Sequence, residues 1–214
     1  SVLVNRLTGS RTIITRKMQT PPSLTYEQKL KLDDLAERLI ASEEPVTILI
    51  DGHEAEISEY LIKKLPNARV VMDGGSLRAS NIKLAAWTDY FVVSEHFARD
   101  YMSYRSLSTE AEIKAALIEL NKICRGEAFI TLGEKGCAFL KSGMLQIVPS
   151  WLCNAVDTTG AGDVFHGAFT YGVHYSWHID NIILFASLTA AISIEKKGVR
   201  ESMPDLAVVH HSLN

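Results

Sequence analysis

The stretch of the sequence best suited to chemistry runs from Asp157 to Asp163 and reads Asp-Thr-Thr-Gly-Ala-Gly-Asp. Gly160 and Gly162 allow the backbone to turn sharply and to approach a ligand without an intervening Cβ. The apolar residues that follow predict a helix, which would place the N–H groups of residues 160–163 at its N-terminus. Free donors and the positive end of the helix dipole form an anion site suited to phosphate. Asp163 would hold a carboxylate beside that anion, ready to accept a proton from a hydroxyl.

This chemistry has an ordinary structural alternative. Asp is among the residue types that most favour turns and helix N-caps, so Asp157 and Asp163 could be turn and cap residues alone. Short glycine-rich loops are common, and the spacing by itself leaves both interpretations open. A lysine-bearing phosphate loop of the pattern GxxxxGK[ST] does not occur in the sequence, and Glu134-Lys135 does not fit it.

The elements that would position this loop alternate between strands and helices. Each expected strand is a short apolar run, and a strand that is apolar on both faces belongs in a parallel sheet covered by helices. Two helices open with capping boxes, Thr25-Tyr-Glu-Gln28 and Thr109-Glu-Ala-Glu112. The alternation predicts right-handed βαβ units and an α/β domain. We expect strands at 46–50, 69–73, 90–94 and 127–132, and helices at 25–43, 54–65, 80–86 and 109–124.

Two hairpins and two further helices complete the expected elements. Gly9 supplies the turn of the first hairpin, and Ser142-Gly143 supplies that of the second. No internal repeat, low-complexity tract or interior linker divides the chain. The expected hairpins pair 2–4 with 12–15 and 137–141 with 144–149, and the helices lie near 161–175 and 179–196.

Composition bounds the class of protein. Of 214 residues, 47% are hydrophobic and 22% are charged, which is ordinary for a folded globular chain. No apolar run approaches a membrane span, and a net charge of −3 gives no electrostatic reason to expect nucleic acid or an anionic membrane as partner. The three cysteines form no metal motif and no disulfide framework, which suits the cytoplasm.

The 157–163 string closely resembles the C-terminal signature of the PfkB (ribokinase-like) family of carbohydrate and nucleoside kinases. Thr131-Leu-Gly-Glu-Lys-Gly136 resembles the family's nucleotide-contacting turn before its late hairpin. Residues 190–204 resemble its last helix and the glycine-rich return beside the nucleotide, and residues 9–14 resemble the strands of its sugar-covering lid. The resemblance covers nearly the whole chain, and the 157–163 loop is its most specific part.

The resemblance implies ATP-dependent phosphorylation of a sugar or sugar-like alcohol. Asp163 would be the catalytic base, and the backbone donors of Gly160, Ala161 and Gly162 would surround the transferring phosphoryl group. Phosphoryl transfer requires mostly positioning and charge neutralisation, so an amide cradle with one carboxylate meets its needs. The implied nucleotide site comprises Thr131, Gly133, Gly136 and Ser94. The implied monovalent-cation site, a candidate for K⁺, comprises Asp157, the carbonyl of Thr159, Gly198 and Ser202, of which the last two could equally form an ordinary turn.

Two features depart from the family pattern. Relatives often carry Asn-x-x-Glu after the strand equivalent to 90–94, with the Glu tied to magnesium through water, whereas this segment reads Ser94-Glu-His-Phe97. Glu95 is a candidate substitute, or Mg²⁺ could be held mostly by nucleotide phosphates and water. The family's first portion, with most of its sugar-binding side chains, has no counterpart here. The expected explanations are a fragment, a truncated gene product or part of a longer polypeptide, and the identity of the sugar is not readable.

The fold implied is a three-layer ribokinase-like α/β sandwich with a mostly parallel central sheet. Residues 1–16 would be a remnant of the small β lid, and residues 17–214 would form the nucleotide-binding and catalytic domain without its N-terminal strands. The expected partners are a sugar-like small molecule and a second copy of the chain bound through the lid, as is common among relatives.

Other readings of the sequence stay open or fit less well. A non-catalytic nucleotide-binding or interaction module derived from such a kinase is the main alternative, favoured by Phe97 and the missing first portion. A Rossmann dehydrogenase fits badly, because the glycine-rich loop lies late and lacks GxGxxG with a following acidic residue. Asp51 and Asp73 end expected strands and could lie near a substrate or form turns. His166 is expected to face packing or solvent, and His210-His211 to lie in a polar tail.

Overall fold

The computed structural model describes residues 2–4, 11–13 and 23–213, and the chain divides into two compact units. We call Thr20–Thr131 with Ala138–Gln146 the sheet unit. The helical unit comprises Ser1–Gln19, Leu132–Cys137 and Ile147–Asn214. Each unit is described by itself.

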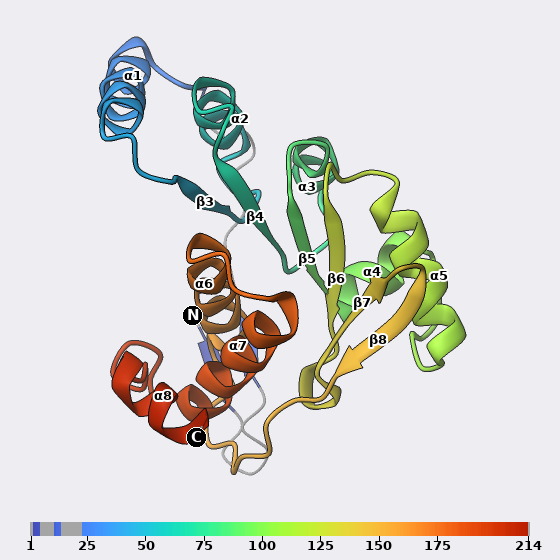
Figure 1. Ribbon diagram of the computed structural model, residues 1–214. Coiled ribbons are helices and arrows are strands. Elements are labelled where there is room, and N and C mark those ends of the chain that lie inside the picture. Colours follow the sequence, from blue (N-terminus) through green and yellow to red (C-terminus); the bar gives the residue numbers. More distant parts are fainter. Residues whose placement is uncertain (1, 5–10, 14–22, 214) are drawn as a thin grey trace. The chain divides into compact units, whose positions relative to one another are not determined.

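A six-stranded, mixed and mostly parallel sheet organises the sheet unit (Figure 1). Its strands are β3 (Thr47–Ile50), β4 (Arg69–Gly74), β5 (Tyr90–Ser94), β6 (Glu127–Thr131), β7 (Cys137–Lys141) and β8 (Met144–Val148), in that spatial order. The first four are parallel, with Ile48 opposite Val70 and Val92 opposite Phe129. The central residues of β4, β5 and β6 are buried, as the continuous apolar runs predict.

Three of the five helices described in the sheet unit begin at a side-chain cap. The five helices are α1 (Tyr26–Ala41), α2 (Ala55–Lys64), α3 (Ala79–Ala85), α4 (Glu95–Tyr101) and α5 (Glu110–Asn121), of which α1, α4 and α5 carry the caps. Both predicted capping boxes are present, at Thr25 before α1 and at Thr109 before α5. The short helix α4 was not among the predicted elements. Ser94 caps it by accepting a hydrogen bond from the Phe97 N–H at 3.0 Å.

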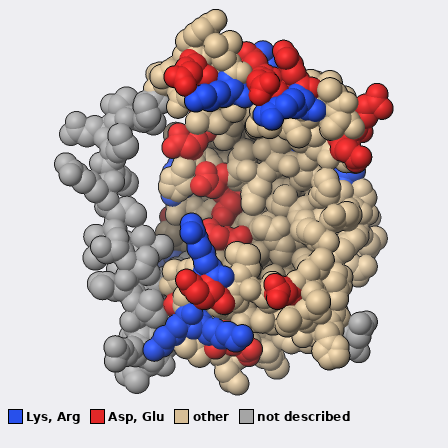
Figure 2. Space-filling model, turned by 90° about the vertical axis from the view of Figure 1, so that its left-hand side faces the viewer, with Lys and Arg blue, Asp and Glu red and all other residues tan. Residues whose placement is uncertain are grey.

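The surface charges of α1 are arranged in pairs along the helix. Glu27 pairs with Lys31 at 2.7 Å and Asp34 with Arg38 at 3.1 Å, each at i,i+4 spacing and largely exposed. Figure 2 likewise shows acidic and basic side chains interspersed on the face it draws. Because exposed pairs of this kind contribute only a few tenths of a kcal/mol each, roughly, the buried strands dominate the stability of this unit.

The hairpin of β7 and β8 turns at Ser142-Gly143, as predicted. Ser142 has φ 53° and Gly143 has φ 76°, and two consecutive positive φ values define the tight two-residue turn that matches strand twist. The first expected hairpin is also paired: β1 (Val2–Val4) runs antiparallel to β2 (Arg11–Ile13) as a separate two-stranded sheet in the helical unit. The turn expected at Gly9 lies outside the described residues.

Three helices form most of the helical unit: α6 (Ala161–His174), α7 (Ile179–Ile194) and α8 (Leu206–Leu213). Helices α6 and α7 lie side by side in Figure 1. Gly172 on α6 permits this approach, because a Cβ there would lie 2.8 Å from Cγ1 of Ile182. The expected polar tail was wrong: His210 lies in α8, with its ring 5.8 Å from that of Phe185 on α7. Among the described residues, no helix is both long and apolar enough to cross a bilayer.

Candidate active site

The loop before α6 is built around Gly160 in the left-handed region. Gly160 has φ 77° and ψ 1° and occupies the N-cap position of the helix. A side chain would be strained at this φ, and its Cβ would also lie 2.5 Å from Cγ1 of Val199. Both the backbone angle and the neighbour therefore require glycine at this position.

The N-terminus of α6 has unused hydrogen-bond donors. The N–H of Ala161 donates to the Thr158 carbonyl at 3.3 Å, and the N–H of Val164 donates to the Gly160 carbonyl at 2.9 Å. The N–H groups of Gly162 and Asp163 have no acceptor among the described residues, and the glycine cap offers no side chain to them. Orphan donors at a helix N-terminus, where the helix dipole is positive, are the features that the predicted anion site requires.

Gly162 leaves open space at this helix start. A Cβ built on Gly162 would have no heavy atom within 4 Å, in contrast to one built on Gly160. Asp163 follows in the first turn, with its carboxylate exposed and without an ion-pair partner among the described residues. An open approach, two free donors and a solvent-facing carboxylate therefore occur within two consecutive residues.

Asp157 ties this loop to a segment 41 residues further along the chain. Its Oδ1 accepts a hydrogen bond from the Thr159 N–H at 3.0 Å, and its Oδ2 accepts one from the Gly198 N–H at 3.3 Å. The buried Ser202 hydroxyl donates to the Gly198 carbonyl. Three residues of the predicted cation site, Asp157, Gly198 and Ser202, thus belong to one hydrogen-bonded network.

The oxygen atoms of this network suit an alkali cation. Carboxylate, hydroxyl and carbonyl oxygens are the ligands that hard cations prefer. The Oγ1 of Thr159 is buried and has no hydrogen-bond partner among the described residues. Because buried polar atoms are seldom left unsatisfied, an orphan oxygen beside Asp157 fits a site that is completed by a ligand. The residues present therefore fit the monovalent cation that the family resemblance implies.

The predicted nucleotide turn is tightly closed. After Thr131 at the end of β6, the Leu132 N–H donates to the Gly136 carbonyl at 2.7 Å, and the Gly136 N–H donates to the Gly133 carbonyl at 3.0 Å. Gly133 and Gly136 have φ 60° and 101°, and a Cβ on Gly136 would overlap the Val148 carbonyl oxygen. This turn and the 157–163 loop belong to the same helical unit.

Ser94 and Glu95 lie in the sheet unit. The Ser94 hydroxyl is engaged on both sides, since it accepts from the Phe97 N–H and donates to the Gly75 carbonyl at 2.8 Å. Phe97 is fully buried, and its ring lies 5.5 Å from that of Phe91. The position at which the family resemblance led us to expect a magnesium-supporting Glu is thus part of the core. Glu95 is half-buried at the first position of α4.

In the described part of the chain, no three His, Cys, Asp or Glu side chains come together in a way that could hold a metal ion. The three cysteines are free thiols. Burial raises the pKa of Cys124 to about 11 and also raises the pKa of the buried Cys137, so neither thiol is poised as a thiolate.

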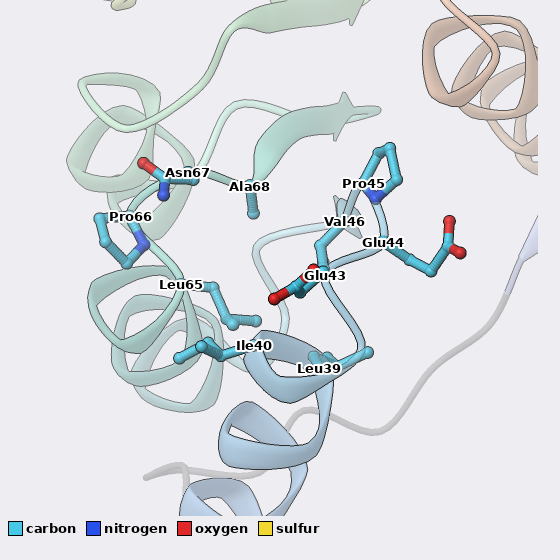
Figure 3. A pocket seen from close by; sticks show the side chains of 10 residues that line it. All are labelled: Leu39, Ile40, Glu43, Glu44, Pro45, Val46, Leu65, Pro66, Asn67 and Ala68. Carbon is cyan, nitrogen blue, oxygen red and sulfur yellow. The ribbon is translucent and has the colours of Figure 1, made fainter.

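One pocket of about 400 Å³ lies in the sheet unit, and none of the predicted site residues lines it (Figure 3). Leu39, Ile40, Leu65 and Ala68 give it an apolar lining, with Glu43 and Glu44 at its rim. It lies where the chain enters β3 and β4, at their amino ends. Ligands of open α/β sheets bind at the carboxyl ends instead, which are the ends that Asp51 and Asp73 occupy. Asp51 forms a local turn there, accepting from the His53 N–H at 2.9 Å.

The sequence did not indicate two residues of the site. Val199, which closes over Gly160, carries no local signal because it lies 39 positions away. His166 was expected to face packing or solvent and is packed, with its side chain 4% exposed; its contact with the loop was not predicted, and its Nδ1 lies 2.6 Å from the Gly162 carbonyl oxygen. The four-residue spacing between Gly162 and His166 was the available signal.

Comparison with known proteins identifies the family. The profile of the pfkB family carbohydrate kinases matches residues 75–206, and the chain belongs to this family. It is 28% identical over 182 residues to a ribokinase of Lactococcus lactis, a match that covers 85% of this chain and 57% of that protein. The chain thus spans little more than half the length of this curated relative.

Two of the solved structures that the chain resembles are ribokinases. The ribokinase of Thermotoga maritima has a TM-score of 0.74 and 23% identity, covering 99% of this chain and 68% of that one. The ribokinase of Arabidopsis thaliana, solved in complex with ribose and ATP, has a TM-score of 0.71 and 20% identity, covering 91% of this chain and 61% of that one. At these identities the likeness establishes the ribokinase-like α/β fold.

Proposed function

We propose that this chain carries the phosphoryl-transfer machinery of an ATP-dependent kinase acting on a sugar or sugar-like alcohol. One observation carries the proposal: the uncapped start of α6 combines free N–H groups at Gly162 and Asp163, open space at Gly162 and the exposed carboxylate of Asp163. Membership of the pfkB family of carbohydrate kinases gives the reaction class.

Asp163 accepts the proton of the acceptor hydroxyl as its oxygen forms a bond to the γ-phosphorus of ATP. The bond between that phosphorus and the β,γ-bridging oxygen breaks, and ADP leaves with the electron pair. The N–H groups at the start of α6 neutralise charge on the transferring phosphoryl group. Such preorganised donors, together with positioning, supply most of the catalysis in phosphoryl transfer.

Supporting sites are assigned in the same proposal. Thr131, Gly133 and Gly136 line the nucleotide, with Ser94 as a further contact. Asp157, the Thr159 carbonyl, Gly198 and Ser202 hold K⁺, whose charge would help to order the cradle. Mg²⁺ is held mostly by nucleotide phosphates and water, with Glu95 as the nearest substitute for the Glu that relatives often carry.

A non-catalytic nucleotide-binding module is the second candidate. One observation favours it: Phe97 lies buried at the position where the family resemblance led us to expect a magnesium-supporting Glu. A module of this kind would keep the phosphate cradle and bind ATP without turnover.

An ADP-release assay over pentoses, hexoses and nucleosides, run beside ATP-binding calorimetry, separates the candidates. If the protein is a kinase, at least one acceptor should raise ADP release above the rate measured without any acceptor. ATP binding with no acceptor-dependent release across the panel would support the module instead. Absence of both binding and release would contradict both proposals.

We also propose that two copies associate through the hairpin of β1 and β2, which would form the lid remnant over the sugar. Sedimentation velocity of the protein tests this association, with a variant deleted for residues 1–16 as the comparison. A monomer at all concentrations would contradict it.

A further inference from the structure

His166 makes an unusual contact for a helical histidine. It lies one turn after Gly162 on α6, its side chain is 4% exposed, and its Nδ1 is 2.6 Å from the Gly162 carbonyl oxygen. A carbonyl oxygen only accepts hydrogen bonds, and two lone pairs facing each other at this distance would repel. The contact therefore requires a proton on Nδ1.

The carbonyl that His166 engages belongs to the peptide that also carries the Asp163 N–H. A peptide is planar, so a bond that fixes the C=O of Gly162 also fixes the direction of the N–H of Asp163. Accepting a hydrogen bond at the oxygen polarises the peptide and makes its N–H a stronger donor. His166 thus acts at one end of a peptide whose other end points a free donor at the anion site.

Besides the helical hydrogen bond that the Gly162 carbonyl accepts from the backbone N–H of His166, this peptide has few restraints. Gly162 has no side chain, is exposed, and would have no heavy atom within 4 Å of a Cβ. Glycine also weakens a helix because it has more conformational freedom to lose. The glycine cap at Gly160 supplies no side chain to hold the Asp163 N–H. Glycine at position 162 thus leaves space for a ligand but makes the Gly162–Asp163 peptide less rigid. The hydrogen bond from His166 restores part of that rigidity.

We propose that His166 is a positioning residue for phosphoryl transfer, which holds the Gly162–Asp163 peptide so that its N–H faces the transferring phosphoryl group. This inference rests on the proposed kinase function, because it assigns that N–H to the anion cradle. His166 touches neither substrate nor nucleotide in this role and acts through the peptide alone.

Two variants separate the hydrogen bond from simple packing. In His166→Asn, the Nδ2 of asparagine is attached to Cγ as the Nδ1 of histidine is, so the donor is kept while ring volume is lost. Asn121 shows that asparagine can make this bond, since its Nδ2 donates to the Leu117 carbonyl four residues earlier at 2.8 Å. In His166→Leu, volume is largely kept and the donor is lost.

We expect His166→Leu to lower kcat on the order of tenfold with a smaller change in KM for the sugar, since one hydrogen bond supports a donor used mainly in the transition state. His166→Asn should retain kcat within about threefold even if it melts earlier. Equal losses of kcat in both variants, in proportion to lost stability, would overturn the proposal. Thr189→Val is the matched control, because Thr189 makes a buried bond to the Phe185 carbonyl four residues earlier, at 2.6 Å, within α7.

Nitrogen-15 NMR of the protein tests the contact without any turnover. The Nδ1 of His166 should resonate in the range of a protonated ring nitrogen, and the Asp163 amide should shift in His166→Leu but stay near its place in His166→Asn. An unprotonated Nδ1, or an Asp163 amide that moves equally in both variants, would refute the role of His166 even in an active kinase. Failure of the kinase proposal shows itself separately, as no acceptor-dependent ADP release by the wild type.

Discussion

The first-turn N–H groups of α4 and α6 differ in whether a side chain accepts their hydrogen bonds. At α4 the Ser94 hydroxyl accepts the N–H of the third helical residue, Phe97, whose side chain is fully buried. At α6 the cap is Gly160, and the third helical residue, Asp163, keeps a free N–H and an exposed carboxylate. Helices α1 and α5 are capped in the same way as α4. The hydroxyls of Thr25 and Thr109 each accept the N–H of the third helical residue at 3.2 Å.

The difference indicates where this protein gives up stability for function. A side-chain N-cap typically contributes about 1 kcal/mol, and α6 has none, like α2, α3 and α7; α6 differs from these three in its glycine cap. Its cap position is instead taken by a left-handed glycine that the Val199 contact also requires. A helix start that forgoes the cap and leaves donors unpaired is expected at a ligand site, where binding replaces the missing bonds.

Replacing Asp163 by asparagine should have the largest effect on activity. Asp163→Asn keeps the shape of the side chain but removes the base, so we expect kcat to fall by roughly two to four orders of magnitude. ATP binding measured by calorimetry should change little, because the N–H donors stay in place. Turnover close to that of the wild type would remove Asp163 from the role of base.

Glu112→Gln is the matched control for that variant. Glu112 is the third residue of α5, and its carboxylate accepts from the backbone N–H of Thr109 at 2.9 Å. This bond and a second one from the Ser108 N–H hold the pKa of Glu112 below its usual value. Glutamine preserves the capping box, so kinase activity should equal that of the wild type. A comparable loss of kcat would mean that removing an acid at this helix position harms the protein in general.

The next largest effect should come from Gly162, one of two open glycines of α6, with the other, Gly167, as its control. Ala is compatible with the protein at both Gly162 and Gly167, since neither Cβ would meet a heavy atom within 4 Å. Gly162→Ala should lower kcat/KM by about tenfold or more, because its methyl group occupies the space through which phosphate approaches the backbone. Gly167→Ala should leave kinetics unchanged.

Both alanine variants should be as stable as the wild type or more so, by up to about 1 kcal/mol, because alanine favours the helix. Urea denaturation beside the kinetic assay checks this. If Gly162→Ala were fully active, the open space at Gly162 would not be ligand space, and the contrast between α6 and α4 would lose its functional meaning.

Gly160→Ala should mainly reduce stability. The left-handed φ costs a non-glycine residue roughly 1–2 kcal/mol, and the Cβ would also meet Val199 at 2.5 Å. We expect a loss of about 2 kcal/mol or more by urea denaturation. In a Val199→Ala background, Gly160→Ala should still lower the free energy of unfolding, but by less than it does in the wild type. The second substitution removes the collision with the Val199 side chain but not the backbone strain. Complete recovery would show that φ at Gly160 is not restrictive.

Most of the fold was predictable because its signals are local. The capping boxes at Thr25 and Thr109, the Ser142-Gly143 turn and the apolar strand runs each specify structure within a few residues. Helix α4 was missed because Ser94 was interpreted only through a family motif, although serine before a helical segment is itself a cap signal. Helix α8 was missed because its histidines suggested a polar tail, whereas Val209 and His210 pack inward or against aromatic rings.

The candidate site was predictable only in part, for a physical reason. Residues 157–163 are contiguous, so their glycines and carboxylates could be interpreted together. The bond from Gly198 to Asp157 spans 41 residues, and only the family resemblance suggested that these residues meet. Nothing local marks the contact of Val199 with Gly160, because it depends on how distant segments pack.

Removing the cap of α4 should have the smallest effect and completes the comparison. Ser94→Ala deprives the Phe97 N–H of its acceptor and the Gly75 carbonyl of its donor, so the free energy of unfolding should fall by about 1 kcal/mol. Ser94→Thr retains the hydroxyl and should recover most of that loss in the same urea titration. If Ser94→Ala cost no stability, the hydroxyl would not be serving as a cap, and α4 would resemble α6 in keeping its first donors available for a ligand.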